Sequence, residues 1–586
     1  MRKNQITRCL LSAGILTMPA FAWAQTSASP TIPPVIQNAQ SIEQRQREQT
    51  EQLRLQQQQE QEQRSRVQTP NAQATATTPD KPVANEGPCF ALKHIIWQQT
   101  QGLIPPPLYL KYKAYRGIHA HECLNQAQII QLQKDLSNAL IEHGHITSKI
   151  NFPAQNIASG QLTIDWYPGT VAKITHDTKT GQPIGSLDVL FPNREGQLYN
   201  QRQADQALEN LKRLSSQGNA TIELQPGEAT GTSNIVYKLE PKTFLQRING
   251  TIGFDNAGSK TSGQYQANGS LSIDSPLHLN DQLTLNYNHN ADASNSDHNT
   301  ETYGAYWGIA TGYGTFDLGY NKSSYLQTVA GYQSNLAYTG NSQDFYASAG
   351  FMLHRSSNSK TQAAIKLGRK ISHNLIDDTE IPIQMRDYVY TDMGLNHTQY
   401  HKDQQYTIGF NVRQNLPSLS KSVGYVYGEP DWNGKWRVYT LNASATIPFK
   451  LGTATFRYNG TLKAQRAKRP TPGSELFSLG SRYTVRGFDE SFSISGEDGV
   501  LIRNEWAYLY GPDKRQQVYL GIDWGKVKGP ATEDSLATSL MGSALGVRGY
   551  YKGLNYDLAL GLPIKSPKYI SHRHDPSFYG SISYQF

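Results

Sequence analysis

The chain of 586 residues has few charged residues and, after its first two dozen residues, no long apolar run. Lys, Arg, Asp and Glu make up 17% of it, against about 25% in ordinary soluble proteins. A helical membrane protein needs about 20 consecutive apolar residues for each span, so the missing runs exclude that class. The 34 Tyr residues argue against a disordered chain, because disordered chains contain few aromatic residues. Polar, Gly-rich sequence with many aromatic residues is typical of a transmembrane β-barrel.

The first 24 residues have the pattern of a Sec-type signal peptide. A basic region includes Arg2 and Arg8, an apolar region covers residues 10–19, and Ala22-Trp23-Ala24 is a small-residue cleavage site. We therefore expect export with residues 1–24 removed, and an N-terminal core helix is the alternative. The net charge of +8 falls on cleavage, and no dense basic face remains, so a nucleic-acid partner is not expected.

Cysteine is scarce, and the exported chain would keep only Cys89 and Cys123. Two cysteines in an oxidising compartment predict one disulfide. A metal site is the alternative, because His119 and His121 lie close to Cys123. No second pair of ligands with zinc-like spacing follows, however. We therefore predict a disulfide, no metal and no cofactor.

Residues 25–66 form an N-terminal segment that cannot belong to a hydrophobic core. From Ser41 to Arg66 it is almost entirely Gln, Glu and Arg, with Glu and Arg placed four residues apart at 43/47 and 60/64. This pattern favours a helix that is polar on every face, which we place at about 37–66. At about 1.5 Å per residue such a helix is long enough to cross a membrane inside a wet lumen. A solvated spacer is the alternative, and residues 67–87 are expected to be a flexible linker.

Residues 88–168 and 169–242 have the composition of ordinary soluble domains and repeat one pattern. In the first unit we expect strands at 89–98, 146–152 and 161–167, and a helix at 125–143. That helix would bury five apolar residues, which are Ile129, Ile130, Leu132, Leu136 and Leu140. In the second unit we expect apolar stretches at 171–175 and 187–190, a helix at 201–215 and strands at 220–225 and 233–240. The sequence thus predicts two tandem α+β units.

From residue 243 to residue 586 the dominant pattern is a strict alternation of apolar and polar residues. Gln264–Asp274, Gln282–Asn290 and the terminal segment ending at Phe586 each place one apolar or aromatic face opposite a polar face. A soluble β-sandwich has the same period but does not require so many aromatic residues at strand ends. At about ten residues per strand with similar connections, this region predicts about 16 antiparallel strands of a membrane barrel.

One loop and one strand in the barrel region have features that suggest a functional contact. Residues 480–490 lie in a long connection and contain Val485-Arg486-Gly487-Phe488. The alternation in the later strand places Gly521, Asp523 and Gly525 toward the lumen. Glycines allow another segment to approach the wall closely, and an inward Asp is a binding point for a cation. Arg486 is the candidate partner of Asp523 in a bidentate ion pair. The alternative is that Arg486 is solvated, as arginines in loops usually are.

These segments and their order resemble one family, the TpsB transporters of two-partner secretion in the Omp85 superfamily. The resemblance covers essentially the whole mature chain, and the two soluble units correspond to POTRA domains. Four stretches carry it, namely Pro153–Ile157 with Gly160 and Leu162, Arg202–Arg213, Val485–Phe488 and Gly521–Gly525, together with the terminal Phe586. One departure is that Gly521 stands where many members carry an aromatic residue, so packing around Asp523 is expected to differ.

The resemblance implies a mechanism and a set of partners. A large unfolded exoprotein of the TpsA type would be recognised in the periplasm by the POTRA domains and secreted through the barrel. The polar helix would plug the lumen, Arg486 and its neighbours would act as a latch on Asp523, and Phe586 would be the signal for the barrel assembly machinery. We expect a monomer in outer-membrane lipid.

The cargo is not named by the sequence, and several alternatives stay open. Among TpsB proteins the two cysteines of the first POTRA domain and the Gln-rich helix most resemble haemolysin activators and transporters of contact-dependent growth inhibition toxins, and of these we favour the second, with a haemolysin or adhesin transporter as the alternative. A barrel insertase is a further alternative, although it usually carries more POTRA domains than the two that fit here. No enzyme activity is expected, because the best candidate cluster, His572 to Asp575, lies in a hairpin connection.

Overall fold

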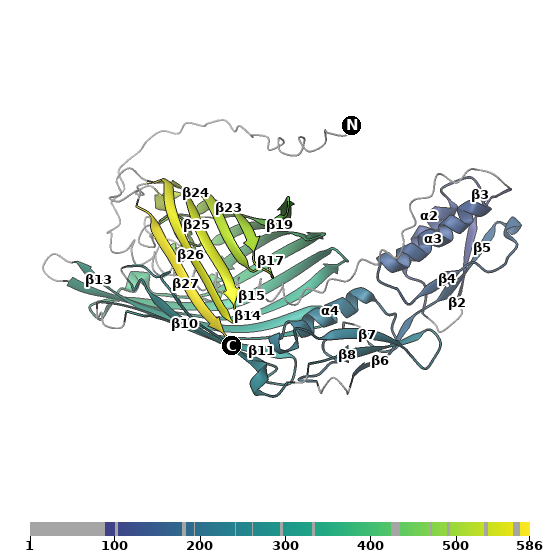
Figure 1. The fold of residues 1–586 in the computed structure, drawn as a ribbon, viewed down its shortest axis with the longest axis horizontal. Helices are drawn as coiled ribbons and strands as arrows, with labels where there is room; N and C mark the ends of the chain where they lie inside the picture. The colour runs from purple at the N-terminus through teal and green to yellow at the C-terminus, as the bar shows by residue number, and fades with distance from the viewer. Residues whose placement is uncertain are drawn as a thin grey trace.

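The structure is a computed structural model of the whole chain (Figure 1). It describes residues 88–99, 104–177, 183–192, 194–240, 242–260, 262–292, 297–330, 335–422, 434–468, 471–488, 493–532, 537–566 and 575–586. Two small α+β units precede a large closed β-barrel, and in Figure 1 the units lie to the right of the barrel. The expected signal peptide, polar helix and linker lie outside the described residues. Within the described ranges, no helix is both long enough and apolar enough to cross a membrane.

The first unit packs two helices against a small mixed sheet. Its elements are β1 (Cys89–Phe90), β2 (His94–Gln99), α2 (Leu108–Ile118), β3 (Leu124–Asn125), α3 (Gln126–Glu142), β4 (Lys149–Asn151), a 3-10 turn at Ile157–Ser159, and β5 (Gln161–Tyr167). The sheet has the order β2-β5-β4, with β2 parallel to β5. Helix α3 begins after Asn125 because the side chains of Asn125 and Gln128 each accept the other's backbone N–H. Leu136 and Trp166 are fully buried in the core between helices and sheet.

The predicted disulfide between Cys89 and Cys123 forms, with the two Cα atoms 5.5 Å apart. It ties β1 to the segment that precedes β3. Both sulfur atoms are used in this bond, so no thiolate is left for the alternative metal site with His119 and His121.

Two expectations for the first unit were wrong in detail, and one helix was missed. The single strand expected at 89–98 is divided into β1 and β2, because residues 91–93 belong to no strand and β1 pairs with β3 whereas β2 pairs with β5. Ile130 is 48% exposed rather than buried, since neighbouring residues of a helix point about 100° apart and Ile129 faces the core. Helix α2 was not expected at all, and its buried face consists of Leu110, Ala114 and Ile118.

The second unit repeats the design with one long helix. Its elements are β6 (Thr170–His176), α4 (Gln201–Lys212), a 3-10 turn at Ser215–Gln217, β7 (Thr221–Pro226) and β8 (Thr232–Lys238). The sheet order is β6-β8-β7. The helix ends three residues before the expected Ser215, and the apolar stretch at 187–190 is a turn whose Leu190 is fully buried in the core.

The barrel closes with sixteen long antiparallel strands, as the alternation predicted, and a two-residue strand, β16, brings the number in its sheet to seventeen. In order around the wall, and counting the two-residue β16 that pairs beside β15, they are β9 (Ile248–Asp255), β10 (Gln266–Asp274), β11 (Asp281–Asn290), β12 (His298–Thr311), β13 (Gly314–Ala330), β14 (Asn335–Arg355), β15 (Ser359–Ile376), β16 (Thr379–Glu380), β17 (Arg386–His401), β18 (Gln404–Asn415), β19 (Arg437–Leu451), β20 (Ala454–Lys468), β23 (Asp498–Tyr510), β24 (Gln516–Lys528), β25 (Ser539–Tyr551), β26 (Leu554–Lys565) and β27 (Ser577–Gln585). The last strand, β27, pairs with the first, β9. Several strands are longer than the ten residues expected, and β14 has 21.

The alternation places apolar side chains outside and polar side chains inside. On β24, Val518 and Leu520 are exposed on the outer face, whereas Asp523 is fully buried on the inner one. On β27, Phe578 and Ile582 are exposed on the outer face, and Tyr579 is buried. The outer face is therefore suited to lipid, and the inner face can bind polar segments of the same chain.

The two ends of the barrel differ, and the second α+β unit contacts the end with the short turns. Asn210 of α4 donates its side-chain N–H to the carbonyl oxygen of Gly312, in the turn between β12 and β13, at 2.8 Å. Glu209 of α4 forms ion pairs with Arg355 at 2.7 Å and with Lys360 at 3.2 Å, on either side of the next turn. In membrane barrels of this kind the short turns face the periplasm and the longer loops face outward. The α+β units therefore lie on the periplasmic side.

The charge of Glu209 is kept by its partners. Burial alone would raise the pKa of Glu209, but hydrogen bonds from Arg355 and the positive charges of Arg355 and Lys360 hold it below its usual range. Glu209 is thus ionised at neutral pH, and it joins the second unit to the barrel wall.

Candidate functional site

The connection between β20 and β23 folds into the barrel instead of projecting from its outer end. Within it β21 (Phe477–Leu479) pairs with β22 (Ile494–Gly496) in a short hairpin. Its apolar side chains Phe477, Leu479, Val485 and Phe488 are all buried, and they share a cluster with residues of β23, β24 and β25. The loop of residues 471–488 is therefore a packed element of the lumen.

Arg486, at the tip of this loop, contacts Asp523 on β24 directly. Its Nε lies 2.6 Å from Asp523 Oδ2, and its Nη2 lies 2.8 Å from Oδ1. The backbone N–H of Arg486 donates to Oδ2 as well, at 3.1 Å. Asp523 is fully buried and Arg486 is 5% exposed. A pair with two parallel bonds in such surroundings fixes the direction as well as the position of the guanidinium.

A second carboxylate, that of Glu505 on β23, completes the arrangement. Arg486 Nη1 lies 2.8 Å from Glu505 Oε2. The other oxygen of Glu505 pairs with Arg548 on β25. Arg503, also on β23, donates from Nη1 to the backbone oxygen of Tyr483 in the loop at 2.8 Å. The tip is therefore held by side chains from two neighbouring strands, β23 and β24, and Arg548 of β25 supports Glu505.

Sequence reasoning missed Glu505 although its face was predictable. Glu505 lies directly opposite Gly521 in the pairing of β23 with β24. Glu505 and Asp523 reach the same guanidinium only because β23 and β24 pair in this register. The alternation within a single strand does not predict how it pairs with its neighbour. The structure thus adds a carboxylate to the expected pair.

Glycines on the wall make room for the tip, and Gly521 is the clearest case. A Cβ added at Gly521 would overlap the guanidinium of Arg486, and one at Gly542 on β25 would overlap the Arg486 carbonyl. Gly487 has φ +102°, a conformation that disfavours any side chain, and its α carbon packs against Gly561 of β26. Gly525 faces Leu479 in the same way. Gly521, which stands where the family pattern often has an aromatic residue, therefore leaves the space that the Arg486 guanidinium occupies.

The loop also reaches the strands that close the barrel. The hydroxyl of Tyr579 on β27 accepts the backbone N–H of Gly487 at 2.8 Å and donates to the carbonyl oxygen of Phe488 at 2.7 Å. Arg482 donates to the backbone oxygen of Asn256, just after β9, at 2.6 Å. Phe586 lies at the other end of this closing pair, where its backbone exchanges two hydrogen bonds of 3.0 Å with Gly250.

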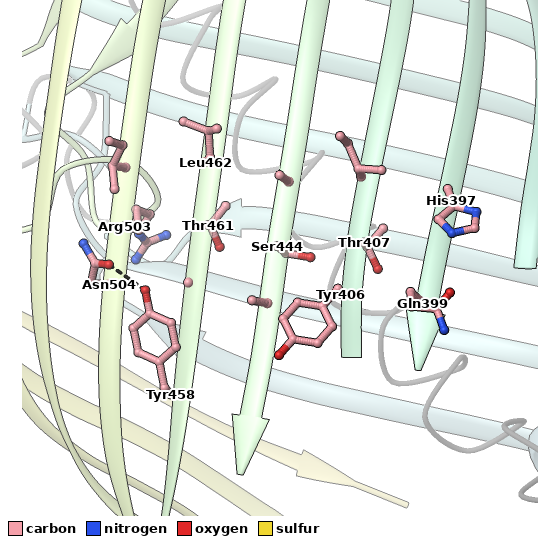
Figure 2. A pocket seen from close by; sticks show the side chains of 15 residues that line it. His397, Gln399, Tyr406, Thr407, Ser444, Tyr458, Thr461, Leu462, Arg503 and Asn504 are labelled. Carbon is pink, nitrogen blue, oxygen red and sulfur yellow. Dashed lines mark hydrogen bonds between the residues drawn. The ribbon is translucent and has the colours of Figure 1, made fainter. Parts of the chain in front are cut away.

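A hollow in the wall lies beside this site and shares Arg503 with it. It has a volume of about 440 Å³, and Figure 2 shows side chains of β17, β18, β19, β20 and β23 around it. Ile408 and Ile502 of its lining are exposed on the lipid-facing side. In Figure 2 the hydroxyl of Tyr458 points to Asn504 and donates a hydrogen bond of 2.7 Å to its side chain. The hollow is thus formed mainly by the outer wall and does not involve the loop.

The other candidate groups do not form a site in the described part of the chain. There, no group of three His, Cys, Asp or Glu side chains is placed to hold a metal ion. Of the His572 to Asp575 cluster, residues 572–574 lie outside the described ranges.

Comparison with known proteins matches the barrel and the two units separately. Residues 231–549 match the family described as haemolysin secretion/activation protein ShlB/FhaC/HecB. Residues 90–169 match the ShlB-type POTRA domain, and residues 170–226 match a second POTRA domain.

The chain belongs to the ShlB/FhaC/HecB family.

Its relatives include outer-membrane and hemolysin transporters. The outer membrane transporter CdiB-2 of Burkholderia pseudomallei is 28% identical over 80% of each chain. The outer membrane transporter CdiB of Dickeya dadantii is 29% identical over 83% of this chain and 85% of its own. The hemolysin transporter protein HpmB of Proteus mirabilis is 28% identical over 70% of this chain and 71% of its own.

A solved structure agrees with the fold. CdiB from Acinetobacter baumannii has a TM-score of 0.78 at 25% identity, covering 95% of this chain and all of that one. This member of the ShlB/FhaC/HecB family is therefore an outer-membrane transporter of two-partner secretion, and not an enzyme. Its α+β units are POTRA domains in the periplasm, POTRA 1 being the first unit and POTRA 2 the second.

Proposed function

We propose that the partner secreted by this transporter is a large exoprotein that carries a contact-dependent growth inhibition toxin. The supporting observation is that four of the relatives reported by the comparison are CdiB transporters, at 26–29% identity over 80–85% of this chain. A haemolysin is a second candidate cargo, because HpmB and ShlB are hemolysin transporters at 28% and 24% identity.

A competition experiment separates the two cargoes. Donor cells would express this chain with the exoprotein encoded beside it, and would be mixed with recipients that lack both genes. We expect the number of viable recipients to fall only when the donors contact them. Lysis of erythrocytes without inhibition of recipients would instead identify a haemolysin.

We propose that the loop of residues 471–488 gates the lumen, with Arg486 as a latch on Asp523. The support is the burial of both side chains and the direct bonds between them. Breaking a buried ion pair is costly, so the latched state would be favoured until another interaction replaces these bonds. Export would require the tip to leave its place, because a loop packed at the wall occupies part of the lumen.

We propose that the POTRA domains bind the unfolded exoprotein by adding a strand to a sheet edge. In POTRA 1 the edge strand β2 covers six residues, His94–Gln99. In POTRA 2 the edge strand β7 covers six residues, Thr221–Pro226. An extended chain can pair with such an edge through backbone hydrogen bonds whatever its sequence, which suits recognition before folding. Folding of the exoprotein outside the cell would then drive export.

We propose that the polar helix of about 37–66 plugs the lumen at rest. Removal of residues 37–66 should raise the single-channel conductance of the purified chain in planar bilayers, because the helix would no longer obstruct the lumen. A shorter deletion within the linker 67–87 is the control, and it should leave conductance unchanged. Equal conductance in the chains with and without residues 37–66 would contradict the plug.

We propose further that the chain acts as a monomer, surrounded by lipid, and that Phe586 is read by the barrel assembly machinery during insertion. An insertase role is the competing proposal. Reconstitution separates the two roles, since an insertase would assemble unrelated barrels in vesicles and a transporter would move its own partner.

A further inference from the structure

The loop that carries Arg486 is attached to the barrel wall at a second place, at its stem. The stem includes a 3-10 turn at Gly473–Glu475, which begins after Pro472 and precedes β21. Glu475 is 4% exposed. A buried carboxylate on a loop requires partners, because an unpaired charge is costly in such surroundings.

The carboxylate of Glu475 has these partners on β17 and β18. Its Oε1 accepts a hydrogen bond from the hydroxyl of Tyr388 at 3.2 Å. Its Oε2 lies 3.3 Å from Nη1 of Arg413. The guanidinium of Arg413 is itself fixed, since its Nε lies 3.3 Å from Asp392 and its plane lies over the ring of Tyr390, 4.5 Å from the centroid. The backbone oxygen of Glu475 accepts an N–H from Gln465 on β20 at 2.9 Å.

The stem and the tip are held by different parts of the wall. The side chain of Glu475 is attached to β17 and β18, whereas the side chain of Arg486, eleven residues later, is attached to β23 and β24. Strands β19 and β20 lie between these two attachments. The segment from residue 475 to residue 486 therefore runs across several strands with its two ends fixed.

We propose that Glu475 is a positioning residue for gating: it anchors the stem to Arg413 and Tyr388, and so sets where Arg486 meets Asp523. Rearrangement of the loop is then confined to the residues beyond Glu475. This inference rests on the proposed gating role of the loop and adds a second determinant to it. It does not depend on which exoprotein is secreted.

The test is the fraction of time that single channels of the full-length chain are open in planar bilayers. We expect Glu475→Gln and Arg413→Gln each to raise this fraction about tenfold, the change that about 1.4 kcal/mol produces. The double variant should open no more often than Arg413→Gln alone, because Arg413→Gln already removes the interaction that Glu475→Gln removes. Tyr388→Phe, which removes one hydroxyl only, should raise the open fraction about threefold, in line with the loss of one hydrogen bond.

Two controls separate gating from folding. All variants should keep the heat-modifiable mobility on SDS gels that marks an intact barrel. Asp387→Asn removes a carboxylate from the same strand, β17, where it pairs with Arg369 at 2.7 Å away from the loop, and should leave the open fraction unchanged.

Arg486→Ala is the reference variant. If Arg486→Ala raises the open fraction and Glu475→Gln does not, the second anchor is wrong while the latch stands. If the effects of Glu475→Gln and Arg413→Gln multiply in the double variant, the two residues act separately and the proposal is overturned. If neither Arg486→Ala nor Glu475→Gln changes the open fraction, the loop does not gate, and both proposals fail together.

Discussion

Two buried ion clusters in this transporter have the same arrangement with opposite charges. At the tip of the inward loop one cation, Arg486, lies between the carboxylates of Asp523 and Glu505. At the junction of POTRA 2 with the barrel one carboxylate, Glu209, lies between the cations of Arg355 and Lys360. Both clusters use the same chemistry, so their roles cannot be distinguished by the strength of the bonds alone.

The difference lies in the backbone that carries each central residue. Glu209 belongs to the helix α4, whose position is set by the core of a whole domain. Arg486 belongs to a loop, next to Gly487 in a left-handed conformation. Leaving the cluster therefore requires the movement of a domain in one case and of a few loop residues in the other. This difference indicates a fixed junction at Glu209 and a releasable contact at Arg486, and four experiments test it.

The largest effect is expected for Arg486→Ala. It leaves Asp523 and Glu505 buried without their shared cation, and the loss of a buried partner costs about 3–5 kcal/mol, so the channel should lose the closed arrangement from which each export cycle would start. We expect the barrel to insert normally and export of the exoprotein to fall about a hundredfold, measured by immunoblot of culture medium. Normal export by the Arg486→Ala chain would contradict the proposal that Arg486 acts as a latch.

Glu209→Gln should loosen the junction rather than the gate. Arg355 and Lys360 would face a neutral amide, and the docking of POTRA 2 should weaken by about 3 kcal/mol. Spin labels at Glu228→Cys and Lys402→Cys, one on POTRA 2 and one on a periplasmic turn, would report this as a broader distance distribution. A distribution as narrow as that of the unsubstituted pair would show that the ion cluster does not fix the domain.

Gly521→Ala probes the close approach at the tip without removing a charge. The new Cβ would overlap the Arg486 guanidinium, so the tip should be displaced and the open fraction should rise about tenfold, as for a loss of about 1.4 kcal/mol. Gly269→Ala on β10 is the matched control, since a Cβ there meets only one atom, at 4.0 Å. Equal behaviour of the two variants would mean that the wall at Gly521 is not close-packed against the loop.

The smallest of the four effects is expected from acid, which should weaken the docking of POTRA 2 on the barrel. The pKa of Glu209 is lowered in the docked state, so docking is fully stabilised above the ordinary glutamate value of 4.5 and loses this stabilisation as pH falls below it. The spin-label distances should therefore broaden below about pH 4.5 and stay narrow at neutral pH. The Glu209→Gln chain should lack this step, and a step of the same size in that chain would assign it to another group.

The barrel was predictable because its strands obey a simple rule, whereas the loop contacts were not. Alternation in a single segment, such as Gln264–Asp274, is enough to say which side chains face lipid. It was also enough to place Asp523 and Gly521 in the lumen, beside a loop whose Arg486 was an evident candidate partner.

Contacts that depend on strand register or on loop conformation produce no pattern in the sequence that would predict them. Glu505 reaches Arg486 only because β23 pairs with β24 in one register, and Glu475 reaches Arg413 only because the stem turns back on the wall. Helix α2 was missed for a related reason. Its Tyr and Lys residues obscure the apolar spacing of Leu110, Ala114 and Ile118, which becomes visible once the core is known.

The contacts of the loop with the closing strands have a consequence for the order of assembly. Asn256, which follows β9, is bonded both to Arg482 of the loop and to Gly580 of β27. This three-way contact can form only after the first and last strands of the barrel have met. The loop would thus reach its final position last, and a seated loop would mark a barrel that has finished closing.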